Sequence, residues 1–260
     1  MSIVTGIAIF LTGLFVGMLI CLEAGRRLRL HRVEKDPKYS EGAGASLVDG
    51  AVFAILGLLI AFTFSGAASR FDARRALIVE EANAIGTAYL RIDLLPAASQ
   101  PGLREDFRQY LDARLVFYRA LPDIDAAKGA ADRVQSLQKA IWSKSVEACR
   151  VSGSSSTSML VLSALNQMID ITTTRSVALQ THPPLIVYGM LGVLVLACSF
   201  LVGYKLTVRG RTRNWIHIAI FAIAMSITIY VILDLEFPRA GFIRIDAVDQ
   251  VLAELRNSMK

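Results

Sequence analysis

Four apolar stretches, each about as long as a bilayer is thick, constrain this chain more than any other feature. They cover residues 3–22, 47–67, 185–204 and 215–233. The hydrocarbon core of a bilayer is about 30 Å thick and is spanned by about 20 mostly apolar residues in a helix. Within lipid, only a helix satisfies every backbone N–H and C=O inside a single segment. The sequence therefore predicts an integral membrane protein with four transmembrane helices.

The basic residues indicate how these helices are oriented. The chain has a formal net charge of +6, and its Lys and Arg side chains gather beside the apolar stretches, so a membrane boundary explains them and no nucleic-acid partner is expected. The short loops between the first two and the last two stretches are both basic, and the positive-inside rule places them in the cytoplasm. The N-terminus, the long middle segment and the C-terminus are then external. The inverted orientation stays open because the opposite side also carries arginines, namely Arg70, Arg74, Arg75, Arg239 and Arg244.

The predicted organisation has four parts. They are transmembrane helices 1 and 2 with a basic connecting loop (1–66), an extramembrane helical bundle continuous with helix 2 (67–182), transmembrane helices 3 and 4 (183–234), and a C-terminal helical tail (235–260). No strand-type alternation bounded by turn residues occurs, so the predicted fold class is all-α.

Helical periodicity sets the expected details of the bundle. Apolar positions keep a helical period through 70–93, so the second membrane helix is expected to continue far beyond the bilayer. Further helices are predicted after Pro101, over 125–151 and over 159–179. The charged segment 23–46 has little apolar periodicity and is expected to be a loop, with at most a short surface helix.

The sequence has no signature of an enzyme. It contains neither a phosphate-binding glycine loop nor a nucleophile elbow. Its three histidines, His31, His182 and His217, lie far apart, each near a predicted membrane boundary. No catalytic residue, metal site or cofactor is therefore expected.

The most informative polar residues follow the second apolar stretch. On a helix with roughly 100° per residue, one arc of this segment is polar and the opposite arc is apolar. The polar arc consists of Asp72, Glu80, Asn83, Thr87 and Arg91, and the apolar arc of Phe71, Ile78, Ala82, Ile85, Tyr89 and Ile92. Two interpretations stay open: a plain amphipathic helix that exposes its polar arc, or a helix whose polar arc lines an aqueous path or binds an ion or a partner.

A second polar group ends the fourth apolar stretch. Asp234 and Glu236 are expected on the same side of the membrane as the arginines of 70–75, because an even number of spans lies between them. They are predicted either to pair with Arg70, Arg74 or Arg75 as a clamp between helices, or to bind ions.

Three runs of residues also carry a resemblance to a family. They are Ser65 to Arg75, Glu80 to Thr87, and Leu233 to Glu236 with Pro238 and Gly241. Together they look like the bacterial bestrophin-like family of multi-span membrane proteins, over nearly the whole chain. This resemblance implies kinship with bestrophins, which are pentameric, anion-selective, calcium-linked chloride channels of mostly helical architecture. It places no pore-neck ring or calcium clasp on particular residues here, and a bestrophin's cytosolic termini differ from the external termini predicted above.

The leading hypothesis is a homo-oligomer in the bacterial inner membrane that conducts small inorganic ions, specifically anions if the resemblance holds. The segment 72–91 and its neighbouring arginines would form the mouth of the path. The alternative is a non-conducting, membrane-anchored sensor or scaffold whose helical bundle binds a partner. Under both hypotheses the lipid bilayer is an expected partner.

Overall fold

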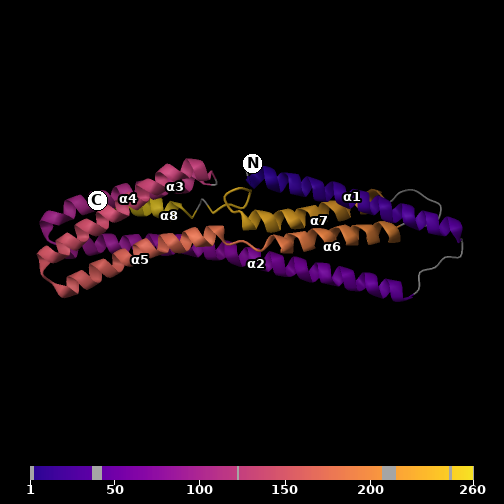
Figure 1. Ribbon diagram of the computed structural model, residues 1–260, viewed down its shortest axis with the longest axis horizontal. Helices are drawn as coiled ribbons and strands as arrows, with labels where there is room; N and C mark the ends of the chain where they lie inside the picture. Colours follow the sequence, from indigo (N-terminus) through magenta and orange to yellow (C-terminus); the bar gives the residue numbers. More distant parts are fainter. Residues whose placement is uncertain (1–2, 37–42, 122, 207–214, 246–247, 260) are drawn as a thin grey trace. The chain divides into compact units, whose positions relative to one another are not determined.

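The computed structural model describes residues 3–36, 43–121, 123–206, 215–245 and 248–259. Within these ranges the chain forms eight α-helices and two short 3₁₀ helices and has no strand, which confirms the all-α fold class (Figure 1). The helices divide between two compact units. The membrane unit comprises Met1–Ser69 and His182–Phe237, and the bundle unit comprises Arg70–Thr181 and Pro238–Lys260.

The membrane unit is built from helices long and apolar enough to cross a bilayer. It contains α1 (Ile3–Lys35), the first part of α2 (Ala43–Leu90), α6 (Leu185–Lys205) and α7 (Trp215–Glu236). Four candidate spans are found in the described residues, with mean hydropathies of 2.3 to 2.6 in their most apolar windows. At most 28% of any such window is buried. So much exposed apolar surface requires lipid or another apolar partner, as expected of transmembrane helices.

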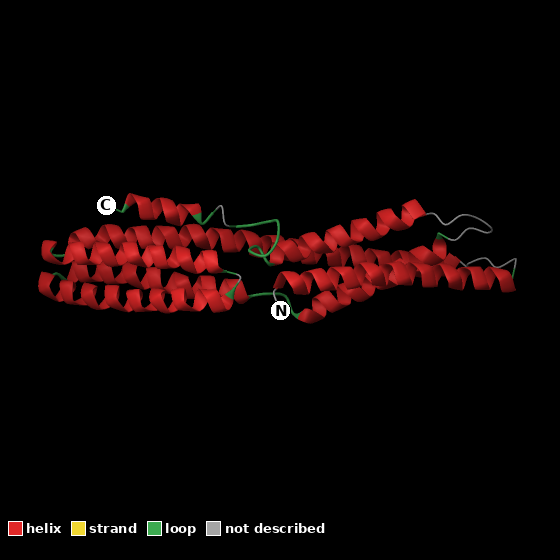
Figure 2. Cartoon of the chain, turned by 90° about the horizontal axis from the view of Figure 1, so that it is seen from above, coloured by secondary structure: helices red, strands yellow, loops and turns green. Residues whose placement is uncertain are grey.

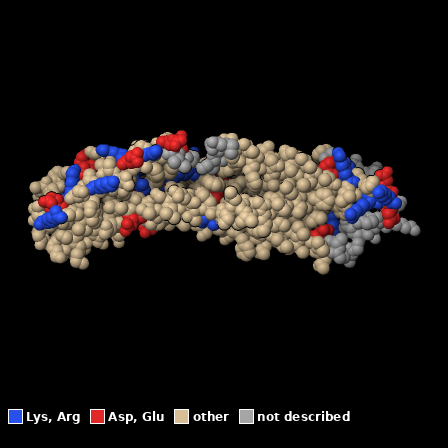
Figure 3. Space-filling model, in the orientation of Figure 1, with Lys and Arg blue, Asp and Glu red and all other residues tan. Residues whose placement is uncertain are grey.

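Charged side chains occupy only part of the surface of the membrane unit. On the face drawn in Figure 3, they gather near the end that holds the last turns of α1 and the first turns of α2. These α1 turns also correct one prediction, because residues 23–35 are helical and were expected to be a loop. Glu23 lies three and four residues before Arg26 and Arg27 and pairs with both at 2.7 and 2.8 Å, which supports helix in a segment without apolar periodicity.

Two glycines allow α1 and α6 to touch backbone to backbone. A Cβ atom at Gly203 would lie 2.0 Å from the carbonyl oxygen of Leu22, and one at Gly25 would lie 2.1 Å from that of Phe200. Neither position has room for a side chain, so these two glycines set the closest approach of the two helices.

We therefore expect Gly203→Ala to destabilise the protein, although alanine is the better helix former. Forcing a methyl group into this contact should cost about 1–3 kcal/mol and lower the midpoint of thermal unfolding in detergent. Gly192→Ala on the same helix is the matched control, because nothing lies within 4 Å of a Cβ there. Equal stability of the two variants would contradict the backbone contact.

The bundle unit continues α2 and adds four α-helices. These are α3 (Gln100–Ala120), α4 (Ile124–Ser152), α5 (Ser155–Gln180) and α8 (Gln250–Ser258), with 3₁₀ helices at Arg91–Leu94 and Ala97–Ser99. Figure 2 shows the long helices of this unit running side by side. Their shared core includes Ile78, Ile85, Phe107, Leu111, Ile141 and Leu165.

Local signals in the sequence explain where these helices begin and end. The Asp123 carboxylate caps α4 by accepting from the backbone N–H groups of Asp125 and Ala126. Gly153, with a φ of 64°, ends α4, and Ser154 caps α5. On α8, Leu252 is buried in the core, and Arg256 donates to both carboxylate oxygens of Asp112 at 2.9 and 3.1 Å.

Candidate functional site

The polar arc of α2 is largely accessible in the single chain. Asp72, Glu80 and Asn83 are exposed, and Thr87 and Arg91 are half-buried. The opposite arc lies in or against the core of the bundle unit, with Phe71 partly buried and Ile78, Ala82, Ile85, Tyr89 and Ile92 buried. Within one chain, this helix therefore has the arrangement of a plain amphipathic helix. Its polar arc remains available to water, ions or a neighbouring subunit.

The four arginines near this arc differ in what they contact. Arg74 is buried; its Nε donates to the carbonyl of Ala178 at 3.0 Å, and its Nη2 to that of Thr181 at 2.9 Å. These carbonyls belong to the end of α5, where helical carbonyls lack intrahelical partners. Arg74 thus ties α2 to α5.

The other three arginines are more accessible than Arg74. Arg70 is half-buried, and Arg75 is half-exposed, with its Nη1 3.6 Å from the Oδ1 of Asp72. Arg91 donates to the carbonyl of Leu160 on α5. A surface pair such as Arg75 and Asp72 contributes little stability, so both side chains can interact with other charges.

Asp234 and Glu236 lie in the membrane unit and are buried. The Oε1 of Glu236 lies 2.9 Å from the Nδ1 of His182, whose ring stacks on Phe237. Asp234 accepts a hydrogen bond of 3.1 Å from the hydroxyl of Tyr230. The predicted pairing of these carboxylates with Arg70, Arg74 or Arg75 would join the two units and stays a prediction.

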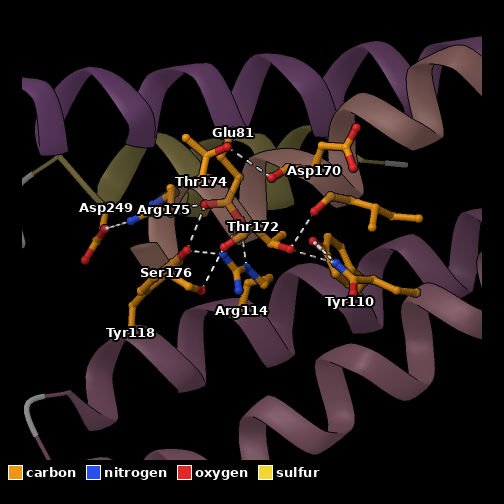
Figure 4. Close-up of polar contacts among 12 residues, drawn as sticks. Glu81, Tyr110, Arg114, Tyr118, Asp170, Thr172, Thr174, Arg175, Ser176 and Asp249 are labelled. Carbon is orange, nitrogen blue, oxygen red and sulfur yellow. Dashed lines mark hydrogen bonds and ion pairs between the residues drawn. The ribbon is translucent and has the colours of Figure 1, made fainter. Parts of the chain in front are cut away.

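The most strongly connected polar group of the bundle unit centres on Glu81, which the sequence analysis did not single out. Glu81 is fully buried, and Arg114 donates from its Nε to the Oε1 of Glu81 at 2.6 Å. Its Oε2 accepts from the Tyr118 hydroxyl at 2.9 Å and from Arg175. Figure 4 shows these side chains converging from α2, α3 and α5. Both oxygens of the carboxylate are therefore occupied by donors from two other helices.

The ring of Tyr118 connects this group to the segment before α8. The guanidinium carbons of Arg175, Arg114 and Arg239 lie 3.9, 4.7 and 5.2 Å from the ring centroid. Cations over an aromatic face are attracted by its quadrupole, most strongly where water is excluded. Asp249 then pairs with Arg239 at 2.9 Å. One buried tyrosine thus contacts three arginines and the carboxylate of Glu81, and a second carboxylate, Asp249, pairs with one of these arginines.

A signal for this group was present in the sequence. Glu81 lies three residues after Ile78 and four before Ile85, so it falls on the apolar face of α2. Arg114 likewise falls among the regularly spaced apolar positions of α3. A charged side chain on a core-facing arc needs a partner when it is buried, and the two positions together could have indicated an ion pair.

Burial and neighbouring charges shift the pKa values of the groups on α3. Burial raises the pKa of Tyr110 to about 12, against the opposing effect of Arg114. Burial also raises the pKa of Tyr118, and Glu81 adds to this while Arg114 opposes it. Burial acts to lower the pKa of Arg114, but attraction to Tyr118 and Glu81 outweighs it and raises that pKa. Both tyrosines are therefore neutral at physiological pH, and Tyr118 can donate its proton to Glu81 in a hydrogen bond.

Comparison with known proteins identifies the family. A model of the Bestrophin-like domain matches residues 9–249, which is nearly the whole chain. The chain belongs to the Bestrophin-like family. This membership confirms the resemblance seen in the sequence. Curated protein sequences yield no significant match.

Solved structures show that the bestrophin-like chain also shares a fold with bacterial relatives. A point mutant of a bacterial Bestrophin homolog from Klebsiella pneumoniae has a TM-score of 0.65 at 13% identity, covering 95% of this chain and 100% of that one. The same homolog, solved by Zn-SAD phasing, has a TM-score of 0.61 at 16% identity, covering 96% of this chain and 98% of that one. At such low identity, the likeness concerns the fold alone.

We expect Glu81→Gln to destabilise the bestrophin-like chain strongly. The substitution keeps the shape of the side chain but leaves Arg114 and Arg175 without their carboxylate, which should cost about 3–5 kcal/mol. The adjacent Glu80→Gln removes the same charge from an exposed position and should change stability by less than about 0.5 kcal/mol. Thermal unfolding of both variants in detergent checks this, and similar midpoints would show that the buried carboxylate is dispensable.

Alkaline pH should also destabilise the protein through its buried tyrosines. The pKa of Tyr110 is about 12 in the folded chain and about 10 when unfolded, so the folded state binds this proton more tightly. The resulting stability, about 3 kcal/mol for a pKa difference of about two, is complete below pH 10 and is lost as the pH rises through 12. Unfolding measured between pH 8 and 12 should therefore depend less on pH in Tyr110→Phe than in the wild-type protein. Equal pH dependence of the two proteins would show that Tyr110 does not cause the loss of stability at alkaline pH.

Proposed function

We propose that this bestrophin-like protein is a homo-oligomeric anion channel in which α2 lines the ion pathway. The observation that carries the proposal is the exposure of α2. Only 6% of its most apolar window is buried, compared with 11 to 28% for the other three candidate spans. Its exposed apolar side chains include Leu47, Val48, Ile55, Leu58 and Phe62. In an assembly of identical subunits, a helix this poorly covered by its own chain is the one available to face a pathway or a neighbour.

The length and continuity of α2 support the same role. The helix has 48 residues without interruption and is about 70 Å long at 1.5 Å per residue. Its apolar first half and its accessible polar arc therefore belong to one continuous helix. A pathway along α2 would begin among charged and amide side chains and continue between apolar ones, an arrangement that channels use for selection and gating.

The charges on the polar side of α2 are of both signs. Arg75 and Arg91 attract anions, whereas Asp72 and Glu80 repel them. Exposed charges at a pathway entrance change the local concentration of permeant ions without large effects on folding. Arg75 and Glu80 are thus the two positions where charge removal should act in opposite directions. Arg74, which is buried against α5, is assigned to packing instead.

The location proposed for the channel is the bacterial inner membrane, with the bundle unit and both termini external. This orientation rests on the basic loops between the first two and the last two apolar stretches. Reporter fusions at the C-terminus and after Gly153 test it. Both fusions are expected on the external side, and both in the cytoplasm would establish the inverted orientation.

Purified protein in liposomes should conduct chloride in preference to potassium. We expect Arg75→Gln to lower the chloride-to-potassium permeability ratio by about twofold or more, and Glu80→Gln to raise it, because each removes one charge from the entrance. Arg150→Gln, which neutralises an arginine of α4 with 75% exposure, serves as the control and should leave the ratio unchanged.

Two results would contradict the proposal, the first its channel activity and the second the place of α2 in the ion pathway. The protein must first be shown to be folded and inserted in both orientations. Ion flux no greater than in protein-free vesicles would then favour the alternative of a membrane-anchored sensor or scaffold. Chloride flux with the same selectivity in all three variants would retain a channel but remove α2 from its entrance.

A further inference from the structure

A cavity in the bundle unit lies between the end of α3 and the segment that leads into α8. Its volume is about 300 Å³. The α3 side is formed by Leu115, Tyr118, Arg119 and Leu121, and the other side by Arg239, Arg244, Asp249, Gln250 and Ala253. This volume is at the lower end of the range of small-molecule sites in proteins. The cavity is distinct from the polar arc of α2, and nothing in the channel proposal uses it.

The charges that line the cavity favour an anion. Three arginines, Arg119, Arg239 and Arg244, line it together with a single carboxylate, that of Asp249. Asp249 is already engaged, because Arg239 lies at 2.9 Å and Arg175 at 3.9 Å from its oxygens. Among the described residues, the lining of the cavity therefore carries an excess of positive charge.

Arg239 is held in place at the wall of the cavity, where its Nη2 donates to the Oδ1 of Asp249 at 3.2 Å. It is only 8% exposed, its Nη1 donates to the carbonyl of Tyr118 at 3.3 Å, and its guanidinium lies over the ring of Tyr118. Both Nη atoms of Arg239 already contact protein oxygens, so this side chain contributes a fixed positive charge to the cavity wall. Gln250, which also lines the cavity, is the first residue of α8. The helix dipole favours negative charge at this N-terminal end of the helix.

We propose that this cavity binds a phosphate-type oxyanion, either inorganic phosphate or the phosphate group of an anionic lipid. Arginine forks match the paired oxygens of phosphate, whereas a chloride ion offers no such geometry. The bound group would bridge Arg119 of α3 and Arg244 of the C-terminal segment and so fasten that segment to the bundle. The site would make the stability of the bundle unit depend on phosphate, independently of conduction.

The full-length protein in a neutral detergent tests the site. Thermal unfolding is followed during titration with sodium phosphate and, at equal ionic strength, with sodium chloride. Binding to the folded state should raise the unfolding midpoint, and the rise should continue with the logarithm of concentration above the dissociation constant. The double variant Arg119→Gln, Arg244→Gln should lose the phosphate-specific part of this rise. Both side chains are exposed, so the variant is expected to fold.

The matched control is Arg133→Gln with Arg150→Gln, which removes the same two charges from exposed positions on α4. Phosphate also stabilises proteins by exclusion from their surface, and this effect should be equal in both double variants. A second experiment uses native mass spectrometry to count the molecules of short-chain phosphatidic acid bound per subunit. Phosphatidylcholine of equal chain length is the control lipid.

Each outcome of these measurements decides between the alternatives. A phosphate response lost only in the Arg119, Arg244 variant supports the site and identifies free phosphate as a ligand. Phosphatidic acid binding lost only in that variant, without a phosphate response, supports the site with a lipid as its ligand. Equal responses of the two double variants in both arms, or no binding of either ligand to the wild-type protein, would overturn the proposal.

Discussion

The buried carboxylate of Glu81 accepts hydrogen bonds from Arg114 and Tyr118 of α3 and from Arg175 of α5. The free energy needed to remove these charges from water nearly equals the free energy gained from their attraction, so the group contributes little net stability. Its effect is to fix register. A shift of α2 by one turn would bury Glu81 away from its donors, leave Arg114 without a carboxylate and leave Arg175 with only Asp249 at 3.9 Å. Each unpaired buried charge would cost several kcal/mol.

With α2 held in this register, its two arcs have fixed surroundings. The apolar arc packs in the bundle core, and Arg74 donates hydrogen bonds to carbonyls at the end of α5. The polar arc therefore remains accessible along the helix that is least covered among the candidate spans. The proposed pathway follows the polar arc of α2. Its position thus depends on how the opposite, apolar arc of α2 packs in the bundle core.

The sequence predicts the parts of this structure that depend on local patterns. Hydropathy gives the four membrane helices, and a period of 3.6 gives the two arcs of α2, because both are properties of contiguous residues. The Glu81 group was missed because its three partners lie 33, 37 and 94 residues away, and pairing over such distances is set by tertiary packing. The helix over residues 23–35 was missed for another reason: ion pairs between successive turns support it where apolar periodicity is lacking.

Chemical modification of Asn83 tests most directly whether the polar arc of α2 faces the ion pathway. Asn83→Cys would be made in a chain with Cys21, Cys149 and Cys198 replaced by serine, and chloride current recorded before and after charged methanethiosulfonate reagents. A negatively charged adduct is expected to lower the chloride current and a positively charged adduct to raise it. Complete labelling, verified by mass, with unchanged current for both reagents would show that the polar arc does not face the ion pathway.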